Sequence, residues 1–191
     1  FKVRLKYILA QLHTRKGDNG PASELFEEVA KKAVYYEMEF NAKLSLAKTH
    51  EGKDKDKIIS ILRKMLKDSK NKDFKDQIYF TLAQVYQRAG MEEKSIENYK
   101  LSAQTSVNNP KQKALSYLAV ADYYFKKPAY IDAQMFYDSS LITLPKEFPN
   151  YDVIRDKAES LTELVGHINT VQREDSLQAI AAMTDEERQV V

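Results

Sequence analysis

Apolar residues recur along this chain at intervals of three and four positions, which is the period of an α-helix that buries one face. One such stripe runs through residues 152–170 and consists of Ile154, Ala158, Leu161, Val165 and Ile168. Similar stripes precede it, and short polar segments separate them. Glycine and proline number only five each, which is few for the turns of a sheet-rich fold. The pattern predicts an all-α protein.

The helical stripes repeat, and two copies agree closely. Each copy presents an aromatic, a large apolar, a small and a second aromatic residue: Tyr79, Leu82, Ala83 and Tyr86, then Tyr117, Val120, Ala121 and Tyr124, 38 residues later. A second helix follows in each, with Ser95 and Tyr99 in one copy and Ala133 and Tyr137 in the other. We expect the small residues of paired helices to face one another, while the large residues fill the space to the next pair.

This order of positions is typical of tetratricopeptide repeats. It predicts a superhelical solenoid of antiparallel helix pairs, with a generic helical bundle as the alternative. An earlier copy is visible because residues 9–13 parallel residues 82–86 and Gly17 parallels Gly90. Its second helix contains Ala22, Phe26 and Val29.

One further pair fits between these copies, over residues 36–48 and 58–67, but the sequence leaves its register open. We therefore predict about four helix pairs over residues 1–149 and capping helices over residues 150–191, which would cover the last apolar face. The cap has two predicted helices, over residues 152–170 and 175–183.

The predicted helix boundaries carry their own signals. Asn109 before Pro110, with Gln112 two residues further, is a good helix start. Residues 50–56 are predicted to form a charged, solvated loop. Thr184 and Glu187 form a capping box, so a new helix is expected there and the chain is expected to be part of a longer protein.

Composition narrows the class of protein. The net charge is only +2 and the basic residues are interleaved with acidic ones, so no nucleic-acid-binding stripe is visible. Cysteine is absent, which excludes disulfides and thiolate metal sites. No apolar run reaches the roughly 20 residues that span a bilayer, so no transmembrane segment is expected in this fragment.

No constellation of residues predicts catalysis. His13, His50 and His167 lie far apart, and none has a second metal ligand at helical spacing. Acidic pairs such as Glu27-Glu28 lie where carboxylates suit a helix start or a solvated face. We therefore expect no catalytic residue, no metal site and no cofactor.

The predicted chemistry is that of a concave protein-binding groove, lined by faces of the first helix of each pair other than its packing face. Two copies supply its candidate residues: Gln77, Gln84, Gln87 and Arg88, then Leu118, Asp122, Phe125 and Lys126. We expect substitutions of Gln87 or Arg88 to weaken a partner without changing the melting temperature. Less constrained tyrosines are further candidates for exposed anchors: Tyr35, Tyr36, Tyr123 and Tyr151.

The groove lacks the clamp with which some tetratricopeptide proteins hold the acidic C-terminal tail of a chaperone. That clamp needs Lys and Asn at set positions, where this chain has Phe80 and Gln84, then Leu118 and Asp122. Recognition of such a tail is not expected.

Several segments resemble one family more specifically than repeat packing requires. They cover residues 65–68, 71–79, 112–118, 137–139, 148–151 and 173–178. Together they resemble the tetratricopeptide lipoproteins of type IX secretion and gliding motility, the SprE/PorW family. The resemblance covers most of residues 35–188 and is weaker over the first 34 residues.

The resemblance implies a periplasmic location and a lipid anchor in the outer membrane. It also implies protein partners in the periplasmic ring and the outer-membrane translocon, and it brings no catalytic residues. Two other hypotheses stay open: a carrier or chaperone whose groove holds extended secreted peptides, and an accessory domain beside an enzyme.

Overall fold

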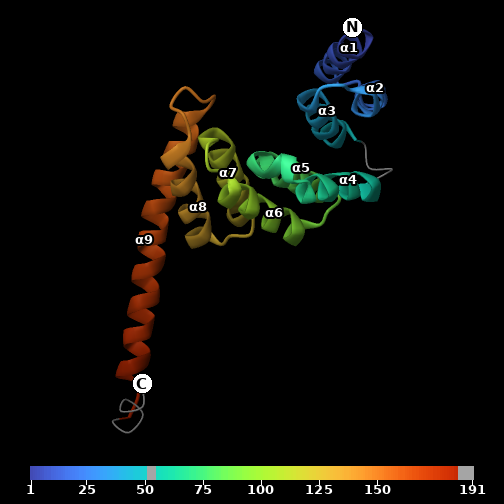
Figure 1. Ribbon diagram of the computed structural model, residues 1–191. Coiled ribbons are helices and arrows are strands. Elements are labelled where there is room, and N and C mark those ends of the chain that lie inside the picture. Colours follow the sequence, from blue (N-terminus) through green and yellow to red (C-terminus); the bar gives the residue numbers. More distant parts are fainter. Residues whose placement is uncertain (51–54, 185–191) are drawn as a thin grey trace. The chain divides into compact units, whose positions relative to one another are not determined.

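The computed structural model describes residues 1–50 and 55–184 (Figure 1). Within these residues the protein is all-helical and contains no strand, which confirms the all-α prediction. The elements are α1 (Lys2–Lys16), α2 (Asn19–Lys32), α3 (Tyr36–Thr49), α4 (Lys55–Lys67), the 3-10 helix η1 (Ser69–Phe74), α5 (Lys75–Arg88), α6 (Glu92–Thr105), α7 (Pro110–Lys126), α8 (Tyr130–Thr143) and α9 (Tyr151–Ala181).

The chain forms two compact units, Phe1–Ser116 and Tyr117–Val191, whose boundary falls inside α7. The core of the first unit contains buried side chains from α1 to α5, with Phe26, Leu62 and Ile78 among the largest. The core of the second unit joins the end of α7 to α8 and α9. Our division at residue 149, which separates repeats from cap, stays a prediction.

The second helix of each predicted pair buries three residues at the same spacing of four and then three positions. These residues are Ala22, Phe26 and Val29; Ile58, Leu62 and Met65; Ser95, Tyr99 and Ser102; and Ala133, Tyr137 and Ser140, each at most 5% exposed. The spacing assigns Ile58 of α4 the place that Ser95 has in α6. The register of this pair was hidden in the sequence because Ile58 and Met65 are large where the other copies have smaller residues.

Small residues mark the contacts between paired helices. The Ser95 hydroxyl donates to the carbonyl oxygen of Ala83 over 2.9 Å, and both residues are buried. Ala121 and Ala133 are fully buried in the core of the second unit. Of the other predicted packing residues, Tyr79, Tyr117 and Tyr124 are half-buried, while the following are buried: Leu82, Tyr86, Tyr99, Val120 and Tyr137.

The turn inside three of the pairs has the same closing hydrogen bond. The Asp18 N–H donates to the His13 carbonyl over 3.0 Å, and the Met91 N–H donates to the Tyr86 carbonyl over 2.9 Å. The Ala129 N–H donates to the Tyr124 carbonyl over 3.0 Å. Gly17 and Gly90 supply the left-handed residue of the first two turns, with φ of 82° and 70°. The parallel between these glycines therefore has a conformational cause.

Two predicted boundaries need correction. The two capping helices are one helix, α9, which runs without a break through residues 170–175 (Figure 1). That stretch contains no glycine or proline that would stop a helix. The predicted loop over residues 50–56 ends earlier, because α4 begins at Lys55 and has Asp56 in its first turn, where a carboxylate suits the helix dipole.

Two other boundary predictions have different outcomes. The Asn109 side chain accepts a hydrogen bond from the Gln112 N–H over 3.2 Å, which is the N-cap contact that the sequence indicated. Glu187 of the predicted capping box and residues 51–54 of the predicted loop lie outside the described residues.

Candidate protein-binding site

A hollow of about 400 Å³ opens on the surface of the first unit between α1 and α3. We call it the α1–α3 hollow. Its lining consists of Arg4, Tyr7 and Ile8 from α1, of Glu37, Met38 and Asn41 from the start of α3, and of Tyr35, which precedes α3 as its N-cap residue. A volume of this size is within the range of small ligand pockets and accepts a large side chain.

Helix α2 positions the two walls of the hollow because it packs against both α1 and α3. Tyr7 lies edge-to-face on the buried ring of Phe26 in α2, with ring centroids 5.7 Å apart. Close approach of α1 to α2 is possible because Ala10 and Ala22 are small and fully buried. The helical parts of both walls are therefore held by the core, and Tyr35 lies in the short connection between α2 and α3.

The lining combines apolar surface with a few polar groups. Tyr35 is 70% exposed and Ile8 is 45% exposed, so both offer apolar area to a partner. Arg4 and Glu37 place opposite charges at the hollow. The Asn41 amide nitrogen donates to the Glu37 carbonyl over 2.8 Å, which leaves its side-chain oxygen as an acceptor. This arrangement suits an apolar side chain of an extended segment, with polar groups available to its backbone.

The repeat alignment contained a signal for this site that the sequence reasoning missed. Counting 73 residues back from the candidate groove position Gln77 gives Arg4, and counting back from Phe80 gives Tyr7. The parallel between Gly17 and Gly90 has the same spacing. The groove face of the first helix pair was thus predictable from the same spacing that gave the candidate residues of the later pairs.

The four groove residues predicted on α5 have mostly structural contacts. Arg88 donates to the carbonyl oxygens of Ala47 and Lys48, over 2.6 and 3.1 Å, at the C-terminal end of α3. Gln87 accepts a hydrogen bond from the Tyr99 hydroxyl over 3.0 Å. Because both side chains bond to neighbouring helices, their contacts count against the expectation that Arg88 and Gln87 can be changed without effect on melting.

The other two α5 residues are partly covered. Gln77 and Gln84 are both half-buried, and the Gln84 side-chain oxygen is buried without a hydrogen bond from any residue in the described part of the chain. Neither residue lines the α1–α3 hollow.

The groove residues predicted on α7 belong to the second unit. Leu118 packs against its core, while Phe125 and Lys126 are exposed. The Asp122 carboxylate accepts a hydrogen bond from the Tyr137 hydroxyl and lies 3.4 Å from the Lys157 ammonium. These contacts join α7 to α8 and α9.

Lys157 lies above two aromatic rings of this cluster, with its nitrogen 3.9 Å from the ring centroid of Phe125 and 4.8 Å from that of Tyr137. Both distances are suited to cation–π attraction. Burial raises the pKa of Tyr137, and the hydrogen bond to Asp122 raises it further, so the phenol stays neutral. The polar groups of this cluster bond to one another, so the cluster stabilises the packing of α7, α8 and α9 in the second unit.

Of the predicted tyrosine anchors, only Tyr35 contributes to the hollow. The Tyr36 hydroxyl donates to the side chain of Asn71 and lies 3.2 Å from the carbonyl of Lys70, so it joins α3 to η1. Tyr123 contacts the ring of Tyr124 edge-to-face at 5.4 Å. Tyr151 is half-buried at the start of α9.

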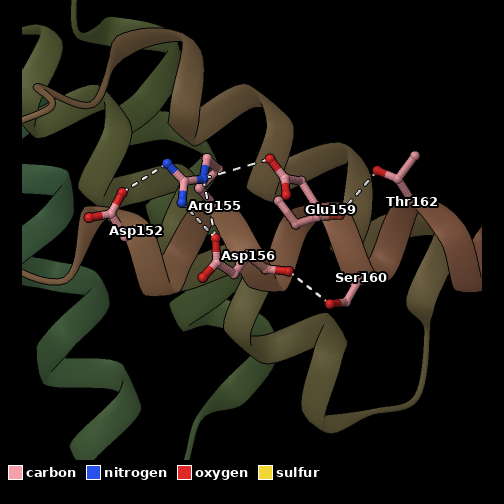
Figure 2. Close-up of polar contacts among 7 residues, drawn as sticks. Asp152, Arg155, Asp156, Glu159, Ser160 and Thr162 are labelled. Carbon is pink, nitrogen blue, oxygen red and sulfur yellow. Dashed lines mark hydrogen bonds and ion pairs between the residues drawn. The ribbon is translucent and has the colours of Figure 1, made fainter.

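A conspicuous cluster of charges lies at the start of α9, where Arg155 is surrounded by carboxylates (Figure 2). Its guanidinium nitrogens lie 2.8 Å from Asp152, 2.8 Å from Asp156 and 3.7 Å from Glu159. These carboxylates raise the pKa of Arg155, that of Asp156 most. All four side chains are well exposed, and such pairs add little stability. With three carboxylates around one guanidinium, the cluster keeps a net negative charge on an exposed surface of α9.

The histidines do not converge. The Nδ1 of His13 lies 3.4 Å from Asp18, and the Nε2 of His167 lies 4.0 Å from Glu163. Within residues 1–50 and 55–184, no three side chains of His, Asp or Glu gather in a group that would hold a metal ion.

The comparisons with known proteins do not identify a family. No family model matches this sequence, and no curated protein matches it. None of the helices in the described part of the chain has the length and apolar composition needed to cross a membrane.

Proposed function

We propose that this protein is a non-catalytic scaffold for protein–protein interactions, built as a tetratricopeptide-like superhelical solenoid with α9 as its cap. The observation that carries the proposal is the α1–α3 hollow, an open apolar depression whose walls are fixed by α2. The repeated buried positions of α2, α4, α6 and α8 support the repeat architecture.

The hollow is the part of the scaffold that receives the partner. A large apolar side chain that leaves water for such a site contributes about 1.5–3 kcal/mol, too little for a stable complex by itself. The remaining affinity comes from further contacts, and two residues of the lining, Tyr35 and Arg4, are suited to supply them. Because the walls do not need to be ordered on binding, little of the binding free energy is lost.

We further propose that the partners belong to the type IX secretion and gliding machinery, at its periplasmic ring and outer-membrane translocon. The support is the likeness of the segments at residues 65–79, 112–118 and 148–151 to lipoproteins of that machinery. These segments include the turn between α4 and α5 and the turn before α9, where repeat packing does not dictate the sequence, together with buried residues such as Met65 and Ser116. The proposal includes a periplasmic location with a lipid anchor in the outer membrane.

A displayed library of random peptides tests the binding proposal. We expect enrichment of peptides with a large apolar residue, and Tyr35→Ala should weaken them by about tenfold, a typical loss for an aromatic anchor. The matched control is Val34→Ala, because Val34 is a neighbour of Tyr35 and is 88% exposed but does not line the hollow. Absence of enrichment, or equal binding to the Tyr35→Ala variant, would reject the hollow as the binding site.

A carrier or chaperone for extended secreted peptides is the second candidate, and the apolar lining of the hollow favours it as well. Affinity purification of the tagged protein from the cell envelope separates the two. Co-purification of a few secretion-machine components in fixed ratio would support the scaffold. Co-purification of many secreted proteins, which the Tyr35→Ala variant no longer retains, would support the carrier.

A further inference from the structure

The outward face of α8 is apolar. Its residues Ile131, Met135 and Ile142 are 47%, 51% and 83% exposed. Their spacing of four and seven positions, with Asp138 between the last two, places all four side chains in one line along the helix. At about 3.6 residues per turn, this line lies opposite the three residues that α8 buries in the core. We call these four residues the α8 stripe.

The other second helices show how this face is ordinarily built. The equivalent positions, counted from the first buried residue of each helix, are Gly20, Glu24, Glu27 and Lys31 in α2; Asp56, Ser60, Arg63 and Lys67 in α4; and Glu93, Glu97, Lys100 and Gln104 in α6. None of these residues is buried, and none has an apolar side chain. A polar outward face is therefore the rule in this chain, and the apolar stripe is a property of α8 alone among the four second helices.

The exposure of this face does not depend on where the chain begins or ends. Helix α4 contacts α3 and α5 and belongs to a unit with helices before and after it, yet its outward face stays open. Helix α2, which packs between α1 and α3, also keeps its outward face open. Because neighbouring helices of the same chain leave this face uncovered, further helix pairs would by the same rule leave the α8 stripe uncovered.

Asp138 indicates the charge of the occupant. Helix α8 contains two acidic residues and no basic one. Asp132 lies in the first turn, where a carboxylate suits the helix dipole, but Asp138 lies beyond that turn. Partial burial raises the pKa of the Asp138 carboxyl, and no residue in the described part of the chain forms a hydrogen bond or ion pair with it. The stripe therefore fits a surface that combines apolar side chains with one Lys or Arg, which would stabilise the charged carboxylate.

We propose that the α8 stripe is a docking site for one amphipathic helix of a partner protein, whose apolar residues cover the stripe and whose Lys or Arg pairs with Asp138. A helix fits because the stripe is a straight line of about 16 Å at the helical rise, which three turns of a partner helix match. This site adds a second surface to the proposed scaffold. It does not depend on the α1–α3 hollow, which belongs to the first unit.

A displayed library of helices, with one face randomised on a rigid helical-hairpin scaffold, tests this proposal against the whole chain. Counter-selection uses the triple variant Ile131→Glu, Met135→Glu, Ile142→Gln, which copies the residues of α6 at these positions. Because α6 has these residues on the same face, the variant should keep its fold, and circular dichroism verifies this. We expect enriched helices with large apolar residues at intervals of three and four positions and a Lys or Arg among them. They should bind the triple variant at least about tenfold more weakly, a typical loss for interface anchors.

An exchange of charges tests the role of Asp138. Asp138→Lys should weaken the selected helices at least about tenfold, because like charges then meet in the interface. Replacing the Lys or Arg of a selected helix by Glu should restore its binding to this variant. The matched control is Val107→Glu, at an apolar residue that is 85% exposed between α6 and α7, and it should leave binding unchanged.

Three results would overturn the proposal. The first is a selection that enriches no helix for the wild type over the triple variant. The second is a set of enriched helices that lack a basic residue or bind the Asp138→Lys variant equally well. The third is another occupant: self-association of the chain, seen by sedimentation, or binding to phosphatidylcholine vesicles, either of which the triple variant removes. None of these results bears on the hollow, whose test depends on Tyr35.

Discussion

Tyr86 offers the most detailed test of how the first unit is held together. Its ring is 3% exposed and belongs to the buried cluster that joins α4 to α5. Its hydroxyl accepts a hydrogen bond from the Arg63 guanidinium over 2.9 Å. The residue thus contributes to stability in two ways that substitution can separate.

The two contributions differ in size. Tyr86→Phe keeps the ring and removes one hydrogen bond from an exposed guanidinium, which can return to water, so we expect a cost of about 0.5–1.5 kcal/mol. Tyr86→Ala also removes the ring from a closely packed core, and such large-to-small changes cost about 3–5 kcal/mol. Urea unfolding monitored by circular dichroism measures both free energies.

The ratio of the two free-energy costs shows whether packing or the hydrogen bond holds Tyr86 in place. If Tyr86→Phe is as costly as Tyr86→Ala, the hydrogen bond rather than the packing holds α4 to α5. If neither variant changes the unfolding midpoint, Tyr86 does not lie between these helices and the register of the repeats is wrong. The half-buried Tyr124 serves as a comparison, and its replacement by Ala should cost less than that of Tyr86.

The remaining predictions concern backbone, capping and charge. Gly90→Ala should lower the free energy of unfolding by about 1 kcal/mol, because φ is 70° there; crowding plays no part, since no atom lies within 4 Å of the added Cβ. Gly166→Ala, on an exposed helical turn, should raise the free energy of unfolding by about 0.5–1 kcal/mol. If both glycine substitutions change the melting temperature equally, the left-handed conformation of Gly90 is contradicted. Arg88→Ala should cost about 1–2 kcal/mol by leaving carbonyls of α3 without their donor, and an unchanged melting temperature would contradict this. Hydrogen bonds, first from Lys32, lower the pKa of Glu28 from 4.5 to about 2, so this contribution is present above pH 4.5 and is lost as pH falls toward 2. Between pH 4.5 and 2 the melting temperature of the Glu28→Gln variant should therefore fall less than that of the wild type. An equal fall in both proteins would refute the pairing.

The helices were predictable from sequence because the apolar period, the small residues at Ala83 and Ser95, and the cap at Asn109 all indicate the same structure. The second pair was harder, since Ile58 and Met65 break the small-residue pattern while keeping its spacing. The length of α9 was underestimated because Val171 and Leu177 lie on different faces, so the apolar stripe ends while the helix continues.

The binding site depended on information that the sequence holds only indirectly. Arg88 looked like a groove residue because its position in the repeat faces outward, but its long side chain reaches back to the end of α3. The reach of a side chain to a distant carbonyl is set by tertiary structure, which no local pattern encodes. The hollow depends in the same way on the distance between α1 and α3, which α2 determines.

The central claim is that the α1–α3 hollow holds a protein partner, and crosslinking in the native cell tests it most directly. A photoreactive phenylalanine analogue placed at Tyr35 should give a few discrete protein adducts, identified by mass spectrometry as components of the secretion machinery. The same analogue at Val171, which is exposed on α9, should not give them. Absence of adducts at Tyr35, or the same adducts from both positions, would contradict the claim.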